Sequence, residues 1–202
     1  MIDVHKIKKL PKIIAVSKTF NLDKILPLID YGHLNFGENK VQEALNKWSE
    51  IKDKNSNIQL HMIGKLQTNK VKFAVKIFDY IHSVDSEKLA KKIADEQAKI
   101  HRKIKIFIQI NIGNENQKSG IQISEVKNLV DYCKKLQLNL VGFMCIPPES
   151  KEPTIYFKEM NKMNNLYNLD ELSMGMSSDF KNAAVHNSTF LRIGSNIFGK
   201  RS

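Results

Sequence analysis

Short apolar runs rich in β-branched residues alternate with amphipathic stretches eight times along the 202 residues, and this alternation most constrains the fold. Such runs are typical of buried parallel strands, and the helices between them connect parallel neighbours. Eight strand–helix units in one domain of this length predict an α/β protein with a single (β/α)8 TIM barrel over residues 1–202. The strands are expected at 13–16, 34–37, 58–63, 80–84, 105–112, 140–146, 172–176 and 190–193.

The helices between these strands begin at recognisable capping residues. Asn21 is the expected N-cap of the first helix and Asp85 that of the fourth. The expected helices span 21–31, 41–51, 68–78, 85–100, 124–136, 154–166 and 178–186, with a short one after the last strand. An open doubly wound sheet is the competing architecture, but the Gly-rich turn that it would carry after the first strand is absent.

Composition argues against several classes of protein. The net charge of +11 is spread along the chain without a dense basic run interleaved with aromatics, so we expect no specific nucleic-acid binding. Cys133 and Cys145 are isolated and form no metal or disulfide pattern, which favours two reduced core thiols. No apolar run is long enough to span a membrane, and the N-terminus does not resemble a signal peptide. We therefore expect a cytoplasmic protein.

Lys18 directly follows the first strand, at the end where barrel enzymes place their active sites. Partial desolvation there would lower the pKa of its amine and produce a neutral nucleophile that condenses with aldehydes. A lysine at a strand end can equally extend into solvent, so position alone leaves both interpretations open.

Glycine and serine follow the last two strands, in the segments 173–178 and 192–196. Glycine allows close approach to the backbone, serine hydroxyls donate hydrogen bonds, and free N–H groups are expected where the next helices begin. The loops after strands 7 and 8 are the usual phosphate site of a barrel. Two tight turns with serine caps are the alternative interpretation.

Together, a lysine after strand 1 and a phosphate site after strands 7 and 8 would bracket a small phosphorylated aldehyde, and pyridoxal 5'-phosphate (PLP) is one. Arg192 lies on the same side of its strand as Gly194 and can reach the pyridine nitrogen. A permanent cation there would keep that nitrogen unprotonated. A salt bridge from Arg192 to Asp179 is the alternative.

The other strand ends supply candidate walls for the site. Asn39 is a neutral group suited to a ring hydroxyl. Met144 can pack on a flat heteroaromatic ring, although plain core packing explains it equally well. His61 is expected to be a hydrogen-bonded core residue, and Asn111 ends the fifth strand.

Eight collinear segments resemble the pyridoxal phosphate homeostasis protein family. They are AVSKT (15–19), FGENKVQE (36–43), HMIGKLQTNK (61–70), IHSVDS (81–86), QINIGNENQKSG (109–120), GFMCIPP (142–148), LSMGMSSDF (172–180) and RIGSNIFGKR (192–201). The resemblance implies a fold like the N-terminal barrel of alanine racemase and PLP bound as a Schiff base to Lys18. It further implies phosphate contacts from Ser177, Gly194 and Ser195, and an arginine at the pyridine nitrogen that matches Arg192.

The sequence departs from the family in two places. The leading helix is mostly absent, so we expect a shortened N-terminus. Lys65 adds a cation near the barrel mouth.

The family implies a carrier of PLP rather than an enzyme with robust turnover. Racemases of this barrel type take a second base from an additional C-terminal domain, which we expect to be missing because the chain ends at Ser202, directly after the barrel. A single base supports exchange better than rapid turnover. We therefore expect a monomer or weak dimer that passes PLP to PLP-dependent enzymes. A racemase or transaminase of unknown substrate, and a barrel for another phosphorylated aldehyde, are the alternatives.

Overall fold

The computed structural model describes residues 10–149 and 152–199, and eight parallel strands form a closed barrel in sequence order, with β1 also pairing with β8. This confirms the predicted barrel. The strands are β1 (Lys12–Val16), β2 (Asn35–Glu38), β3 (Gln59–Met62), β4 (Tyr80–Val84), β5 (Lys105–Ile110), β6 (Asn139–Cys145), β7 (Glu171–Ser173) and β8 (Phe190–Ile193).

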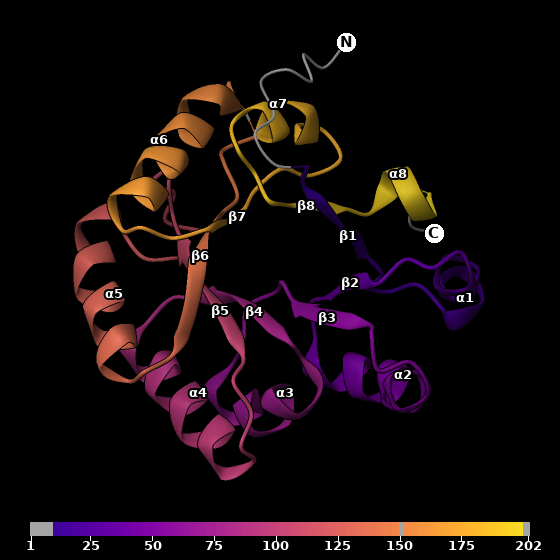
Figure 1. Ribbon diagram of the computed structural model, residues 1–202. Helices are drawn as coiled ribbons and strands as arrows, with labels where there is room; N and C mark the ends of the chain where they lie inside the picture. Colours follow the sequence, from indigo (N-terminus) through magenta and orange to yellow (C-terminus); the bar gives the residue numbers. More distant parts are fainter. Residues whose placement is uncertain (1–9, 150–151, 200–202) are drawn as a thin grey trace.

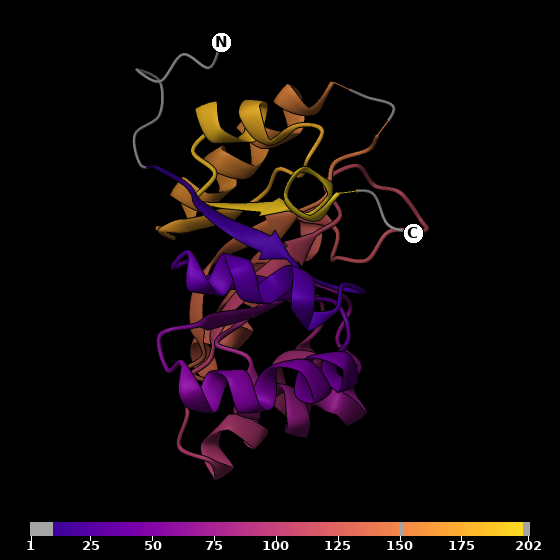
Figure 2. The same ribbon diagram turned by 90° about the vertical axis from the view of Figure 1, so that its right-hand side faces the viewer.

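Helices connect successive strands and lie around the outside of the barrel, as Figure 1 shows. In Figure 2, β1 and β8 run side by side, and the last helix follows directly at the carboxyl end of β8. The helices are α1 (Leu22–Asp30), α2 (Val41–Lys54), α3 (Val71–Ile77), α4 (Glu87–Lys99), α5 (Val126–Lys135), α6 (Pro153–Leu166), α7 (Phe180–Val185) and α8 (Ser195–Phe198).

Side-chain alternation along the strands divides the core into two layers. One layer fills the barrel itself, and the other lies between the strands and the helices. In β8, Phe190 belongs to the inner layer and Leu191 to the outer one. The inner apolar cluster consists of Ile14, Tyr80, Phe107, Met144 and Phe190, with Val141 and Ile146 packed against it.

Several predicted boundaries differ from the structure by a few residues. The expected helix at 68–78 begins as a 3-10 turn (η2, Thr68–Lys70), and a second 3-10 turn (η3, Ile123–Glu125) precedes α5. β7 ends at Ser173 rather than at 176, because Gly175 adopts a left-handed conformation with φ +93° that a regular strand does not allow.

The two predicted caps also have different outcomes. The Asp85 prediction is wrong: Ser86 is the N-cap of α4, and its hydroxyl accepts a hydrogen bond from the Leu89 amide. Asp and Ser are comparable caps, and Ser86 takes the role because α4 begins at Glu87. Asn21 does occupy the N-cap position of α1, but its side chain makes no capping hydrogen bond.

Cys133 and Cys145 are both buried free thiols, as expected, and burial raises the pKa of each to about 12. None of the helices within residues 10–149 and 152–199 is long and apolar enough to cross a membrane. In the same ranges, no cluster of three or more His, Cys, Asp or Glu residues is placed to hold a metal ion. The shortened N-terminus was predicted for residues that largely lie outside those described.

Candidate functional site at the barrel mouth

Lys18 is half-buried in a turn directly after β1, at the carboxyl-terminal mouth of the barrel. The next residue, Thr19, has φ +67°, which is an unfavourable conformation for a β-branched side chain. Such strained backbone persists only where surrounding contacts hold it, and it often marks functional sites. The structure therefore places Lys18 on a segment whose conformation is imposed from outside.

The contacts that impose this conformation come from α2. Lys47 donates from Nζ to the Ser17 carbonyl oxygen, to Glu38 Oε1 and to Glu43 Oε1, at 3.0 Å each. Glu43 Oε1 in turn accepts a hydrogen bond from the Thr19 amide at 2.6 Å. Burial acts to raise the pKa of Glu43, but the hydrogen bonds from Thr19 and Lys47 outweigh it and lower that pKa. We call Glu43 and Lys47 of α2, together with Glu38 at the end of β2, the α2 clamp.

Glu38 is the buried centre of this clamp, and its Oε1 also accepts from the Ser17 hydroxyl at 2.8 Å and from Trp48 Nε1 at 3.0 Å. The clamp was not predicted from the sequence. The i, i+4 spacing of Glu43 and Lys47 was visible in the sequence, but it is also typical of an ordinary surface pair.

The two predicted phosphate loops lie beside one another in the structure. Met174 donates its amide to the Phe190 carbonyl, and the Arg192 amide donates to Gly175, so pairing continues past the end of β7. The Asn196 side chain then donates to the Ser177 carbonyl oxygen at 3.4 Å and links the loops.

The phosphate loops also lie next to the end of β1. A Cβ atom built on Gly194 would lie 3.5 Å from Val16 Cβ, two residues before Lys18. Gly194 and Ser195 begin α8, as predicted, whereas Ser177 lies in a turn three residues before α7. The structure thus brings together three elements that are far apart in sequence, namely the Lys18 turn and both loops.

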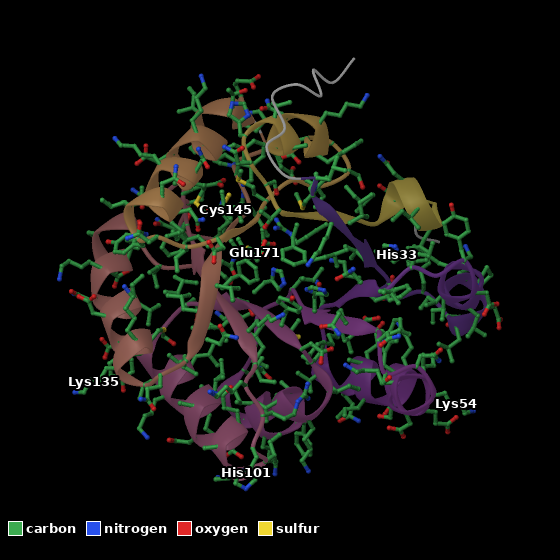
Figure 3. The ribbon with its side chains drawn as sticks, in the orientation of Figure 1. His33, Lys54, His101, Lys135, Cys145 and Glu171 are labelled. Carbon is green, nitrogen blue, oxygen red and sulfur yellow. The ribbon has the colours of Figure 1, made fainter. Side chains whose placement is uncertain are left out.

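Arg192 is buried behind these loops, with an exposed fraction of 5%. Its Nη1 donates to Ser173 Oγ and its Nη2 to the carbonyl oxygen of Cys145, both at 2.8 Å. Cys145 ends β6 and is labelled in Figure 3. Neither hydrogen bond involves Asp179, whose Oδ1 instead accepts from the Met176 amide. The alternative of a direct salt bridge to Asp179 is therefore not what holds Arg192.

The remaining predicted wall residues have different environments. Asn39 lines a cavity of about 300 Å3 at the mouth. Met144 is fully buried within the barrel, which supports its core-packing interpretation and leaves no surface for a ligand to contact. The Asn111 side chain closes its own turn through two hydrogen bonds to the Glu115 backbone. The lining of the cavity comprises Asn39, Ile63, Gly64, Lys65, Gln109, Gln117, Lys118, Ser119 and Ile146.

His61 and His82 are fully buried in the barrel, and His61 makes the core hydrogen bonds predicted for it. Burial is the largest cause that lowers the pKa of both imidazoles well below the ordinary value. Charge repulsion adds to this effect: Lys12, Lys52, Lys105 and a protonated His33 would each act on His61, and Arg192 and a protonated His61 would each act on His82. Both histidines are therefore neutral at pH 7.

The two neutral histidines predict acid sensitivity. Below about pH 6.5 the unfolded chain protonates them and the folded protein does not, so stability is full above that pH and falls as the pH decreases. Each histidine contributes a slope of up to about 1.4 kcal/mol per pH unit. Urea unfolding at several pH values between 7.5 and 5 measures the slope.

The matched variants for this measurement are His82→Asn and His101→Asn, the second at an exposed position. The first is expected to reduce the slope and the second to leave it unchanged. Equal slopes in both variants would contradict the assignment.

Comparison with known proteins identifies the family of the chain. The profile of the family "Alanine racemase, N-terminal domain" matches residues 4–202. The pyridoxal phosphate homeostasis proteins of Pasteurella multocida and Escherichia coli K12 are 35% and 36% identical to the chain. Each alignment covers 94% of this chain, and 86% and 85% of the respective relatives.

Solved structures show the same fold. PipY of Synechococcus elongatus, solved without PLP, is 32% identical with a TM-score of 0.88, covering 94% of this chain and 93% of PipY. The structure of PipY with PLP bound gives a TM-score of 0.84. Alanine racemase of Clostridium difficile shares the fold at 13% identity and a TM-score of 0.74, and the chain spans 55% of its length. The chain therefore belongs to the pyridoxal phosphate homeostasis proteins, within the alanine racemase N-terminal domain family.

Proposed function

We propose that this protein binds PLP at the barrel mouth, as a Schiff base on Lys18, and serves intracellular PLP homeostasis. The observation that carries the proposal is the convergence of the Lys18 turn with the linked loops after β7 and β8. A family relative has been solved with PLP bound. When bound, PLP supplies an aldehyde for the lysine amine and an electron-withdrawing ring.

The donor set at the mouth fits such a group. Amide groups at the start of α8 and the hydroxyls of Ser177 and Ser195 are suited to a phosphate. Arg192 supplies a permanent cation on the side of the pyridine nitrogen, and Asn39 can face the ring hydroxyl. Met144 is buried beneath this layer, so we assign it to the support of the site rather than to contact with the ring.

We propose a carrier rather than an efficient catalyst. The relatives that match over most of the chain are named homeostasis proteins rather than enzymes, which supports this assignment. PLP-dependent enzymes are the proposed recipients, and the proposed site of action is the cytoplasm. Rapid racemisation or transamination of any amino acid would contradict the carrier assignment.

The direct test is reduction of the PLP-treated protein with borohydride, followed by peptide mass mapping. We expect a visible absorbance band before reduction and a pyridoxyl group on the peptide that contains Lys18 afterwards. A modified peptide that contains a different lysine, with Lys18 unmodified, would overturn the site.

Gly194→Ala is expected to weaken phosphate binding while leaving the fold intact. The new methyl group would make only ordinary contacts, the nearest at 3.5 Å to Val16, so stability should change by less than about 0.5 kcal/mol. It would, however, project into the mouth on the side of Arg192 and obstruct backbone approach. We expect an increase of about tenfold in the PLP dissociation constant, measured by absorbance titration. An unchanged constant would place the phosphate elsewhere.

A further inference from the structure

A continuous chain of hydrogen bonds crosses the interior of the barrel from Arg192. Arg192 Nη1 donates to Ser173 Oγ at 2.8 Å, and Ser173 Oγ lies 2.8 Å from His82 Nδ1. His82 Nε2 lies 3.0 Å from His61 Nδ1, and His61 Nε2 lies 3.2 Å from Asn35 Oδ1. The chain thus joins β8, β7, β4, β3 and β2.

One arrangement of protons satisfies every link of this chain. The Asn35 amide oxygen can only accept, so His61 carries its proton on Nε2 and donates to it. His61 Nδ1 then accepts from His82, which carries its proton on Nε2. His82 Nδ1 is left to accept the Ser173 hydroxyl hydrogen, and Ser173 Oγ accepts from Arg192, because arginine can only donate. All donors point away from Arg192.

Packing holds both imidazole rings in this orientation. His61 stacks on Tyr80 with ring centroids 4.4 Å apart, and His82 stacks on Phe107 at 4.3 Å. Phe190 lies against both imidazoles. A ring flip in this layer would exchange the nitrogen and carbon positions and break two hydrogen bonds at once.

Positive charges around the hydrogen-bond chain keep its two histidines neutral. Arg192 lies at one end, and Lys12, Lys52, Lys105 and His33 act on His61 from β1, α2, β5 and the turn before β2. Lys12 lies over the Phe190 ring and Lys105 over the Tyr80 ring, at 5.4 and 4.8 Å from the centroids. An added proton on either histidine would thus meet cations at both ends of the barrel.

We propose that Ser173 and His82 are positioning residues for Arg192. Together with the Cys145 carbonyl, they fix the plane of the guanidinium group and decide which of its edges faces the ligand. The inference deepens the proposed function and rests on it, because it concerns the group that would face the pyridine nitrogen. A guanidinium group held in one orientation would keep the nitrogen unprotonated more effectively than a mobile one.

The first test needs no ligand. Nitrogen-15 NMR of histidine-labelled, PLP-free protein is expected to show two neutral imidazoles with the proton on Nε2, unchanged from pH 8 to pH 6. Ser173→Ala is expected to shift the His82 Nδ1 resonance, because that nitrogen loses its hydroxyl donor. A proton on Nδ1 of His82, or titration of either ring near pH 6.5, would contradict the assigned hydrogen-bond chain.

The second test measures the effect on bound PLP in matched variants. Ser173→Ala is compared with Ser188→Ala, which removes an equally buried serine hydroxyl. The Ser188 hydroxyl faces the carbonyl oxygens of Met174 and Phe190 and, unlike that of Ser173, accepts no hydrogen bond from Arg192. We expect Ser173→Ala to shift the absorbance maximum of bound PLP and its pH dependence, and to raise the dissociation constant by roughly threefold to tenfold. Ser188→Ala should change neither.

Substitutions of His82 separate positioning from packing. His82→Asn keeps an acceptor near the place of Nδ1 and is expected to restore the wild-type spectrum in large part, whereas His82→Leu should behave like Ser173→Ala. If the Lys18 adduct forms but all these spectra are identical, the positioning proposal fails alone. If no adduct forms in the wild type, the proposed function fails, and the NMR result still decides whether the hydrogen-bond chain exists.

Discussion

Replacing Lys18 by alanine is expected to abolish the visible absorbance of the PLP-treated protein and the borohydride-stable adduct. The lysine supplies the only covalent link in the proposed site, while the phosphate loops stay intact and retain weak binding. We expect the apparent affinity for PLP to fall by about 100-fold or more, which corresponds to roughly 2.7 kcal/mol. Absorbance and mass spectrometry of the reduced protein measure the adduct, and equilibrium dialysis against PLP measures the affinity.

Lys65→Ala is the matched control for this variant, because it removes the same charge from an exposed lysine at the mouth. It is expected to keep the adduct on Lys18 and to change the affinity by no more than about threefold. An adduct of undiminished yield in Lys18→Ala would show that another amine carries PLP.

The second large effect is expected on stability, from Lys47→Met. The substitution keeps most of the side-chain volume but leaves the Glu38 carboxylate, which is fully buried, without its cationic partner. Removing one member of a buried ion pair costs about 3–5 kcal/mol. Hydrogen bonds from Ser17 and Trp48 remain on Glu38, so we expect a value near the lower end, measured by urea unfolding at pH 7.5.

Lys127→Met provides the comparison. Lys127 pairs with Asp131 at the i, i+4 spacing that Glu43 and Lys47 also have, but on an exposed surface. That pair should contribute no more than about 0.5 kcal/mol. Lys47→Met should also slow adduct formation at Lys18, since the α2 clamp holds the strained Thr19 turn. Equal losses of stability in the two variants would contradict the assignment of the clamp.

Much of the fold followed from local pattern. The strand predicted at 105–112 is a β-branched run whose apolar character alone indicates burial on both faces, and β5 spans Lys105–Ile110 of it. The boundary of β7 was predicted less well, because the left-handed Gly175 depends on contacts with β8 and α7 rather than on the local sequence. Asp85 and Ser86 are both good caps, and only the exact start of α4 distinguishes them.

Parts of the candidate site were also visible in the sequence. Lys18 and the loops at 173–178 and 192–196 could be placed at one end of a barrel because parallel strands share a carboxyl edge. Their mutual contacts, such as the link from Asn196 to Ser177, depend on the closure of β1 on β8 and had no local signal. Met144 illustrates the limit, because the sequence left ring contact and core packing equally open, and only its depth within the barrel favours core packing.

The sequence by itself determined the eight-fold alternation, the position of Lys18 after the first strand and the glycine–serine loops after the last two. These features depend on side-chain polarity and backbone freedom over a few residues. Only the tertiary structure decided how Lys18 is held, through an α2 clamp of three charged residues, and how Arg192 is oriented, through Ser173 and the buried histidines. Those contacts join residues far apart in the chain, and only barrel closure brings the partners within hydrogen-bond distance.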